Sequence, residues 1–229
     1  MIDFHTHILP EMDDGASSVE EAVDMINELQ SQGVSTIVST SHYYMQDESV
    51  DSFVKRRGIA YNKLVTYANQ NNIKLPNIIL GAEVLFSPIL CDIDCKPLCI
   101  GNTPYILLEM PYTKFSSSHF KALENFLNVS GLQCILAHVE RYYHFNDDKA
   151  VEKLVSHDVL CQINAGSVID KKLRKKTLKL IKNDCAHILG SDTHNMSSRK
   201  PNISDAMKIL DKKKLGTELM CNAAELLNL

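Results

Sequence analysis

The sequence contains no apolar run that approaches the roughly 20 residues needed for a membrane-spanning helix. It also lacks a basic region followed by an apolar stretch at its N-terminus, so we expect no signal peptide. Basic residues are not in excess, because the net charge is −4, and this gives no indication of nucleic-acid binding. These absences together predict a cytoplasmic protein.

The seven cysteines show no spacing typical of a disulfide framework, and their odd number fits reduced thiols in a cytoplasm. Cys91, Cys95 and Cys99 are spaced by four, which matches neither a CxxC zinc pattern nor the usual iron–sulfur runs. A soft-metal cluster remains an alternative. The simpler interpretation is a set of small, semi-buried residues in a connecting segment.

The chain also lacks linkers, low-complexity segments and internal repeats, so a single domain over residues 1–229 is the simplest organisation. Short apolar runs alternate with helical patterns, which implies parallel strands with right-handed crossovers. The predicted strands cover residues 2–5, 34–40, 77–82, 105–109, 133–138, 160–164 and 186–190. The first predicted helix begins after Ser18 and ends at Gly33, and the others cover residues 50–71, 116–130, 147–157, 170–183, 202–213 and 217–228.

Histidine and acidic residues stand at or just after the C-terminal ends of these strands. They are His5, His7, His42, Glu83, Glu109, His138, Asp192 and His194. In a closed α/β barrel these strand ends meet at one mouth, where such folds hold their active sites. An open doubly wound sheet would spread them too widely, so the pattern favours the barrel.

Two of these pairs have spacings that suit metal ligation. His5 and His7 are two residues apart, which on a strand places both side chains on one face, and Asp192 and His194 repeat the arrangement. Imidazole and carboxylate groups bind hard or borderline divalent metals. We therefore predict a metal centre gathered from the whole fold, and a hydrolytic reaction.

Two acidic residues end apolar runs in the middle of the chain. Glu83 and Glu109 would be costly to bury without a partner, and the alternative to a metal is a basic side chain from elsewhere in the fold. Asp14 lies in an Asp-Asp-Gly segment that would by itself be a turn. Next to the His5–His7 pair, we expect Asp14 to offer a carboxylate to the metals or to a leaving group.

Two arginines follow the predicted ligands, Arg141 three residues after His138 and Arg199 five residues after His194. A guanidinium fits phosphate with two parallel hydrogen bonds, so we predict a phosphate clamp at the mouth. The remaining histidines have no paired ligand and are expected at the surface or in the core. They are His119, His144, His157 and His187. The tyrosines beside the ligands either wall the mouth or pack in the core.

These motifs resemble the polymerase-and-histidinol-phosphatase (PHP) superfamily, which has an HxH start, a middle histidine, acids at strand ends and a DxH finish. They resemble more closely the bacterial tyrosine phosphatases of capsule and exopolysaccharide gene clusters, whose HxHxLPxxDDG pattern is matched in full by HTHILPEMDDG at residues 5–15. The later segments GAE (81–83), LEMP (108–111), AHVERY (137–142) and GSDTH (190–194) are also similar.

The resemblance implies a distorted, TIM-like (β/α)7 barrel of the PHP type with up to three divalent metals, often manganese, with iron, cobalt or zinc as alternatives. It implies three ligand sets: His5, His7, Glu83 and Asp192; Glu83, Glu109 and His138; and Asp14, His42 and His194. It places phosphate-binding arginines at Arg141 and Arg199. Asp14 and His42 are then also candidates to protonate a leaving group.

The implied reaction is metal-dependent hydrolysis of phosphotyrosine in a protein, and the implied partner is the tyrosine kinase of the same polysaccharide system. The alternatives are a small-molecule phosphatase such as histidinol phosphatase, and a non-catalytic metal-stabilised protein that binds a kinase. None of the seven cysteines is followed six positions later by arginine, as cysteine-dependent tyrosine phosphatases require. A tyrosine phosphatase with this sequence would therefore rely on metal.

Overall fold

The computed structural model describes all residues from 1 to 229 and contains nine short strands, which pair in parallel. They are β1 (Ile2–Thr6), β2 (Thr36–Ser39), β3 (His42–Tyr43), β4 (Asn77–Leu80), β5 (Glu83–Leu85), β6 (Tyr105–Glu109), β7 (Gln133–Leu136), β8 (Leu160–Asn164) and β9 (Ile188–Gly190). Their order is β1-β2-β4 in one sheet and β3-β5-β6-β7-β8-β9 in the other.

The two sheets are parts of one curled layer. β2 leads into β3 and β4 into β5, and the backbone hydrogen bonds from Gly81 to Ser39 and from Glu83 to Thr40 continue the pairing across both interruptions. β9 meets β1 at the other side, where the amide of Asp192 donates to the carbonyl of His5 at 2.8 Å. The nine strands therefore make seven barrel positions, and the predicted distorted (β/α)7 barrel is confirmed.

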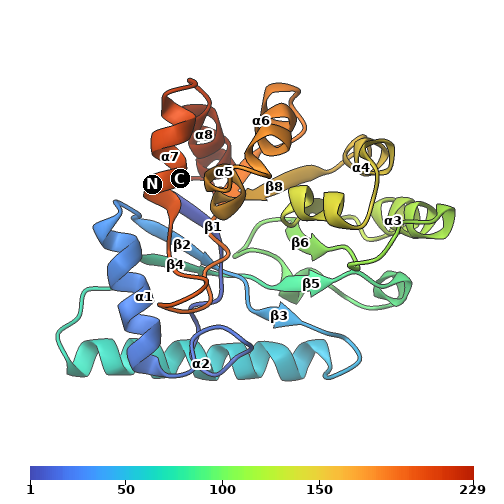
Figure 1. Ribbon diagram of the computed structural model, residues 1–229. Coiled ribbons are helices and arrows are strands. Elements are labelled where there is room, and N and C mark those ends of the chain that lie inside the picture. The colour runs from blue at the N-terminus through green and yellow to red at the C-terminus, as the bar shows by residue number, and fades with distance from the viewer.

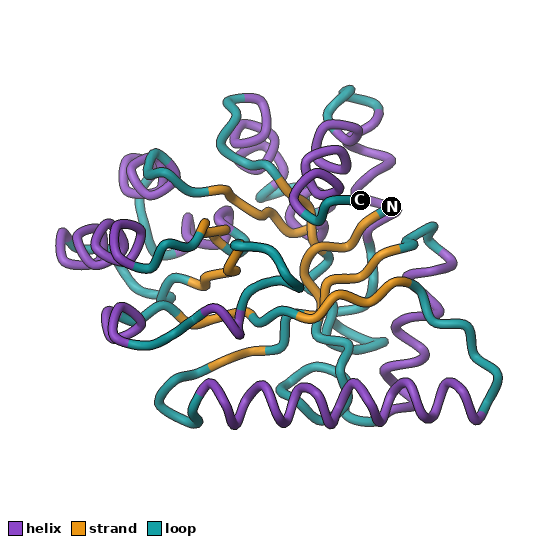
Figure 2. Tube along the Cα trace, turned by 180° about the vertical axis from the view of Figure 1, so that it is seen from behind, coloured by secondary structure: helices purple, strands orange, loops and turns teal.

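Helices surround the strands (Figures 1 and 2). They are α1 (Val19–Ser31), α2 (Val50–Gln70), α3 (Ser117–Val129), α4 (Asp148–Val155), α5 (Ala165–Ile169), α6 (Arg174–Lys182), α7 (Ile203–Asp211) and α8 (Gly216–Leu226), with short 3₁₀ helices η1 (Pro88–Asp92), η2 (Lys96–Leu98) and η3 (Val139–His144). None of the helices combines the length and the apolar character needed to cross a membrane.

Helix α1 shows how the sequence forms these elements. Ser18 caps it by accepting a hydrogen bond from the Glu21 amide at 3.2 Å, and Glu20 and Glu21 lie in its first turn, where the helix dipole favours negative charge. Its apolar residues recur at helical spacing and are buried, including Ala22, Ile26 and Leu29.

The structure corrects one predicted helix, at residues 170–183. This segment begins with a break, because the backbone of Asp170 is extended and its carboxylate accepts a hydrogen bond from the Lys172 amide at 2.8 Å, as in an Asx turn. The helix proper, α6, starts only at Arg174. The one-turn helix α5, which the sequence did not indicate, follows β8 directly and places Gly166 and Ser167 beside the C-terminal end of the barrel.

Candidate metal centre

All nine predicted metal-ligand residues lie together at the C-terminal ends of the barrel strands. Eight of them are distributed over three neighbouring groups of possible ligands, in which the ligand atoms of each group lie within 4.8 Å of one another. The groups are His5, His7, Glu83 and Asp192; His42, Glu83 and Glu109; and His7, Asp14, His42 and His194. The ninth residue, His138, contacts both carboxylates of the second group.

The deepest group is completely buried and combines two histidines with two acids. The Nε2 atoms of His5 and His7 lie 3.0 and 3.2 Å from Oε2 of Glu83, and each lies 3.6 Å from Oδ1 of Asp192. The four side chains come from β1 and the residue that follows it, from β5 and from the segment after β9, so the site depends on the closed barrel.

Glu83 connects this group to the next one. Its other oxygen, Oε1, lies 2.7 Å from Nε2 of His138, which is itself 3.5 Å from Oε1 of Glu109. Burial and the negative charge of Glu83 raise the pKa of Glu109. Two carboxylates held this close in a buried site favour a cation between them.

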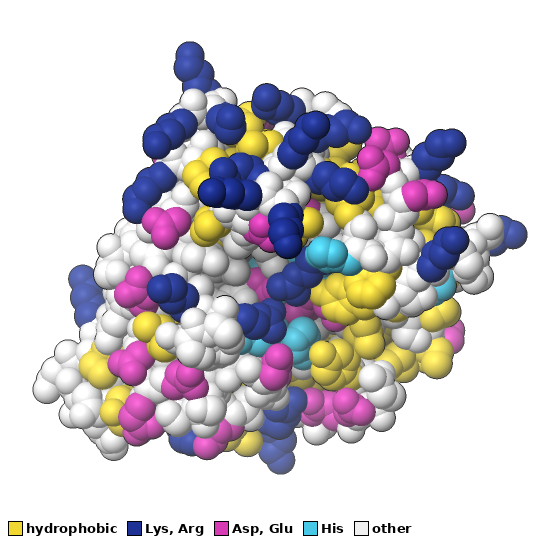
Figure 3. Space-filling view, viewed as in Figure 1, with side chains coloured by type: hydrophobic (Ala, Val, Ile, Leu, Met, Phe, Trp, Pro, Cys, Tyr) yellow, Lys and Arg dark blue, Asp and Glu magenta, His cyan; other side chains and the backbone are white.

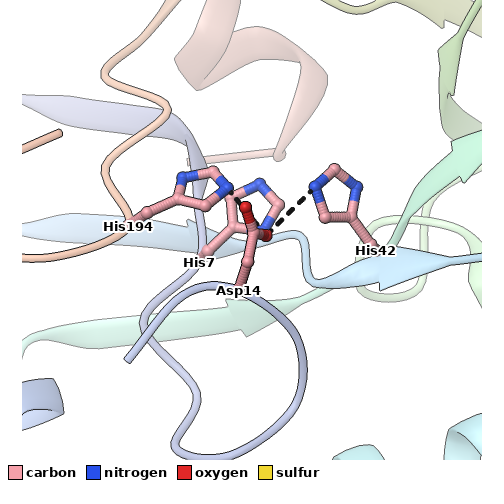
Figure 4. A group of neighbouring side chains, drawn as sticks. All are labelled: His7, Asp14, His42 and His194. Carbon is pink, nitrogen blue, oxygen red and sulfur yellow. Dashed lines mark ion pairs between the residues drawn. The ribbon is translucent and has the colours of Figure 1, made fainter. Parts of the chain in front are cut away.

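The third group lies nearer to the surface (Figure 4). Asp14, whose side chain is 64% exposed, reaches from the loop after β1 and places Oδ1 3.3 Å from Nε2 of His194 and 3.5 Å from Nε2 of His42. The ring of His7 stacks on that of His194 with 3.8 Å between centroids. This group therefore lines the opening of the site.

The side chains fit divalent metals in their present arrangement. Nδ1 of His42 and Nε2 of His194 are buried without a hydrogen-bond partner, and Nε2 of His5 faces Nε2 of His7 at 3.1 Å. Burial and the neighbouring His7 lower the pKa of His194 to about 3, which leaves its nitrogen lone pair free for a ligand. A donor set of imidazole nitrogens and carboxylate oxygens suits manganese, iron, cobalt or zinc.

Asp13 orients two of the histidines, a role that the sequence alone did not reveal. Its Oδ2 lies 2.8 Å from Nδ1 of His7 and also accepts a hydrogen bond from the His42 amide at 2.8 Å. A carboxylate behind a histidine holds the ring so that its other nitrogen points at the metal. Gly15 is required beside it, since a Cβ there would lie 2.2 Å from the carbonyl oxygen of His7.

Two further polar residues, on β8, form hydrogen bonds with the predicted ligands. Oε1 of Gln162 lies 3.0 Å from Nδ1 of His5 and accepts a hydrogen bond from the His138 amide, and Nδ2 of Asn164 donates to Oδ2 of Asp192 at 2.8 Å. Polar residues at alternate positions of an otherwise buried strand are the sequence signal that could have indicated them.

His138 and Asp192 share an uncommon backbone conformation. Their φ angles are +31° and +55°, in the left-handed region that non-glycine residues rarely adopt. Each follows the last residues of a barrel strand, where the chain turns out of the sheet. Such strain concentrates at functional sites, so the surrounding structure must hold both residues in place.

The two predicted arginines reach the same carboxylate. Nη2 of Arg199 lies 2.8 Å from Oδ1 of Asp192, Nη2 of Arg141 binds its Oδ2, and Nη1 of Arg199 lies 3.5 Å from Asp14. Both arginines line a cavity of about 450 Å³ above the metal-ligand groups. Its walls include Tyr44 from the segment after β3 and Tyr112 from the segment after β6.

The sequence left open whether the tyrosines beside the ligands line the mouth or pack in the core, and the structure shows both. Tyr44 lines the mouth, whereas Tyr43 and Tyr142 are buried in the core. The hydroxyl oxygen of Tyr142 accepts a hydrogen bond from the Met110 amide at 2.8 Å. Tyr143 is half-buried and lies under the Lys176 ammonium group. Tyr112, which the sequence did not single out, is the second aromatic wall of the mouth.

The cysteines contribute nothing to these groups of possible ligands. Cys95 and Cys99 are buried in the apolar core, as expected for small residues of a connecting segment, and burial raises their thiol pKa values to about 12 and about 11. Cys134 is buried too, and its thiol pKa is raised to about 12. These thiols are therefore protonated near neutral pH and are poor nucleophiles.

The family model for capsular polysaccharide synthesis proteins of the CpsB/CapC type matches residues 1–227. The chain belongs to the CpsB/CapC family. The resemblance to the phosphatases of capsule gene clusters is thereby confirmed.

CpsB/CapC relatives are similar to this chain along most of its length. The tyrosine-protein phosphatase CpsB of Streptococcus pneumoniae is 31% identical, with 93% of this chain and 90% of the relative covered. The tyrosine-protein phosphatase YwqE of Bacillus subtilis is 29% identical, with 96% and 87% covered.

Solved structures agree with this family assignment. A chain from the crystal structures of YwqE and of pneumococcal CpsB, described as metal-dependent tyrosine phosphatases, superimposes with a TM-score of 0.83 at 27% identity, covering 100% of this chain and 94% of that one. A TatD-family hydrolase from Entamoeba histolytica superimposes with a TM-score of 0.54 at 10% identity, covering 99% and 97%, which shows a shared fold alone.

Proposed function

We propose that the protein is a metal-dependent protein-tyrosine phosphatase. The observation that carries this proposal is the cavity above the metal-ligand groups, where Arg141 and Arg199 stand beside Tyr44 and Tyr112. Two guanidinium groups suit a phosphoryl group, and aromatic walls suit the ring of a tyrosine. The names of the CpsB and YwqE relatives support the same activity.

We propose up to three divalent ions, with manganese as the first candidate. His5, His7, Glu83 and Asp192 would hold one ion. Glu83, Glu109 and His138 would hold the second, and Asp14, His42 and His194 the third. When bound, such ions polarise phosphoryl oxygens and lower the pKa of water to about 7, which provides a nucleophile at neutral pH.

The chain's own groups would position the substrate. Arg141 and Arg199 would bind the phosphoryl oxygens, and Asp192 holds both guanidinium groups in place from behind. Asp14 and His42 lie at the opening, where either group, when it does not hold the third ion, could hold a proton for the departing tyrosyl oxygen. A phenolate leaves readily, so this proton contributes less than the arginines do.

We further propose that the substrate is a phosphotyrosyl protein of the cytoplasm, with the tyrosine kinase of the polysaccharide system as the first candidate. The capsular-synthesis description of the family supports this assignment. All the proposed ligands would then belong to a single domain of residues 1–229.

The decisive test is phosphate release from a phosphotyrosyl peptide by the purified protein. We expect release to stop when a chelator is added and to return with manganese, whereas His5→Ala should remain inactive under all three conditions. Histidinol phosphate should be assayed alongside. Faster turnover of histidinol phosphate than of the peptide would replace this proposal with a small-molecule phosphatase, and metal binding without any turnover would indicate a binding protein.

A further inference from the structure

A second cavity of about 500 Å³ adjoins the mouth. Tyr112, Arg141 and Arg199 line both cavities, so these three side chains form the divide between them. The far side of the second cavity is formed by the start of α5, including Ser167, and by the segment after β9, including Lys200. A ligand whose phosphoryl group lies between the arginines therefore has a second, separate cavity beside it.

Two side chains that can carry a positive charge line the second cavity but not the mouth, His144 and Lys200. Neither side chain makes an ion pair or a hydrogen bond within the protein. Some exposed lysines nearby are paired, as Lys176 is with Asp148 and Lys208 is with Asp205, whereas the ammonium group of Lys200 has no such partner. The second cavity thus has positive charge that the protein itself does not neutralise.

The carboxylates that line the cavity offset this charge only in part. Asp192 contacts both arginines and Asp170 is exposed, so three basic side chains (Arg141, Arg199 and Lys200) stand against two acidic ones and leave a formal charge of +1. Residues 171–214 contain thirteen of the 24 lysines and arginines but only four acidic residues, in a protein whose net charge is −4. Figure 3 shows these basic side chains gathered above a recess that contains acidic and histidine side chains.

We propose that the second cavity binds an anionic side chain of the substrate, carried by a residue within two positions of the phosphotyrosine. The anion is either a carboxylate or a second phosphoryl group, and Lys200 and His144 are the groups that meet it. An extended peptide advances about 3.3 Å per residue, so a near neighbour of the phosphotyrosine can cross the divide at Tyr112. This inference rests on the proposed phosphatase function.

The second cavity would affect the choice between substrates, because exposed charges distinguish between ligands more than they strengthen binding. The test therefore compares kcat/KM between acidic and neutral peptides. Phosphotyrosyl peptides are made in pairs that differ only by Glu or Gln at one of the two positions on either side. A second series replaces Glu by phosphotyrosine and Gln by tyrosine. The kcat/KM of each acidic peptide is divided by that of its neutral pair.

For the wild-type protein we expect a ratio of about two to five at one or more positions, the range of an exposed charge contact. The ratio should fall to about one in a Lys200→Gln, His144→Gln double variant. Lys213→Gln is the matched control, since Lys213 is exposed and unpaired in the same basic segment but lies outside the cavity. It should keep the wild-type ratio. The series that shows the larger ratio identifies the anion.

A wild-type ratio near one at every position overturns this inference and leaves the phosphatase proposal intact. Retention of the preference in the double variant, with a melting temperature equal to that of the wild type, overturns it as well. If no phosphotyrosyl peptide is hydrolysed while p-nitrophenyl phosphate is, the proposed function is wrong and this inference is wrong with it.

Discussion

Oδ2 of Asp13 lies 2.8 Å from Nδ1 of His7, and the other ring nitrogen of that histidine, Nε2, points at Glu83 and Asp192. The carboxylate thus determines which nitrogen of His7 is available to a metal. Because Asp13 also receives the His42 amide, one buried side chain orients residues of all three ligand groups.

We predict that Asp13→Asn lowers metal affinity and activity by about 10- to 100-fold, the usual cost of losing a group that orients a ligand. The measurement is a manganese titration followed by thermal denaturation and by peptide turnover. Asp24→Asn, an exposed change on α1, is the control and should behave as the wild type. Equal manganese affinity in Asp13→Asn and the wild type would contradict the prediction.

Metal removal should destabilise the protein. Glu83 and Asp192 are buried beside histidines, so loss of bound cations leaves charges that water cannot reach. At a metal concentration 100 times the dissociation constant, binding stabilises the folded state by about 2.7 kcal/mol. Differential scanning fluorimetry should therefore show a lower melting temperature with chelator and recovery with manganese, and a smaller recovery in His5→Ala.

The arginines should be sensitive even to a conservative change. Arg141→Lys and Arg199→Lys retain the charge but lose the planar fork that contacts Asp192 and that we propose binds phosphate at the same time. We expect kcat/KM for a phosphotyrosyl peptide to fall by about 10- to 100-fold in each, since charged hydrogen bonds contribute about 1.5–3 kcal/mol. Steady-state kinetics at saturating manganese measures this, and unchanged kcat/KM would remove the arginines from the phosphate site.

Cys134→Ser should keep peptide phosphatase activity. The thiol of Cys134 is buried and its pKa is raised to about 12, so it is protonated during turnover and does not act as a nucleophile. Turnover is compared with the wild type after circular dichroism has shown that the variant is folded. A folded but inactive Cys134→Ser protein would count against metal-dependent chemistry.

Alanine substitutions at Gly190 and Gly58 should change the stability in opposite directions, because Gly190 lies against another strand and Gly58 lies in an open helical position. A Cβ on Gly190 would lie 2.5 Å from Cβ of His5, so Gly190→Ala should push β9 away from β1 and cost about 1–3 kcal/mol of stability. A Cβ on Gly58, in the middle of α2, meets nothing within 4 Å. Gly58→Ala should therefore stabilise the protein by about 0.5–1 kcal/mol. Urea denaturation of both variants measures the free energy of unfolding, which should decrease in Gly190→Ala and increase in Gly58→Ala.

The parts of the fold that the sequence indicated are those with a strong local pattern. Apolar runs and capped amphipathic helices identified the seven barrel positions and most of the crossovers. The start of α6 was misplaced because the turn at Asp170 depends on a side-chain hydrogen bond to Lys172 that helical periodicity does not encode. Between β5 and β6 the crossover contains only 3₁₀ turns, consistent with the absence of a helical pattern there.

Most of the candidate ligands were recognisable because they lie at or just after the end of a predicted strand, where a barrel collects side chains from distant segments. The residues that orient these ligands could not be recognised in the same way. Asp13 was passed over in favour of its neighbour Asp14, since only the folded loop shows which carboxylate turns inward to His7. Gln162 and Tyr112 likewise act through contacts with residues 24 and 26 positions away, which no local pattern reports.

The closure of β9 on β1 has a consequence for how the protein is made. The Ser191 amide donates to the carboxylate of Asp3 across 188 residues of sequence, and the deepest ligand group needs both strands. Contacts of such long range form late, because the chain must first lose the entropy of a very large loop. During synthesis on the ribosome, the ligand group of His5 and His7 can therefore be completed only after almost the whole chain has emerged.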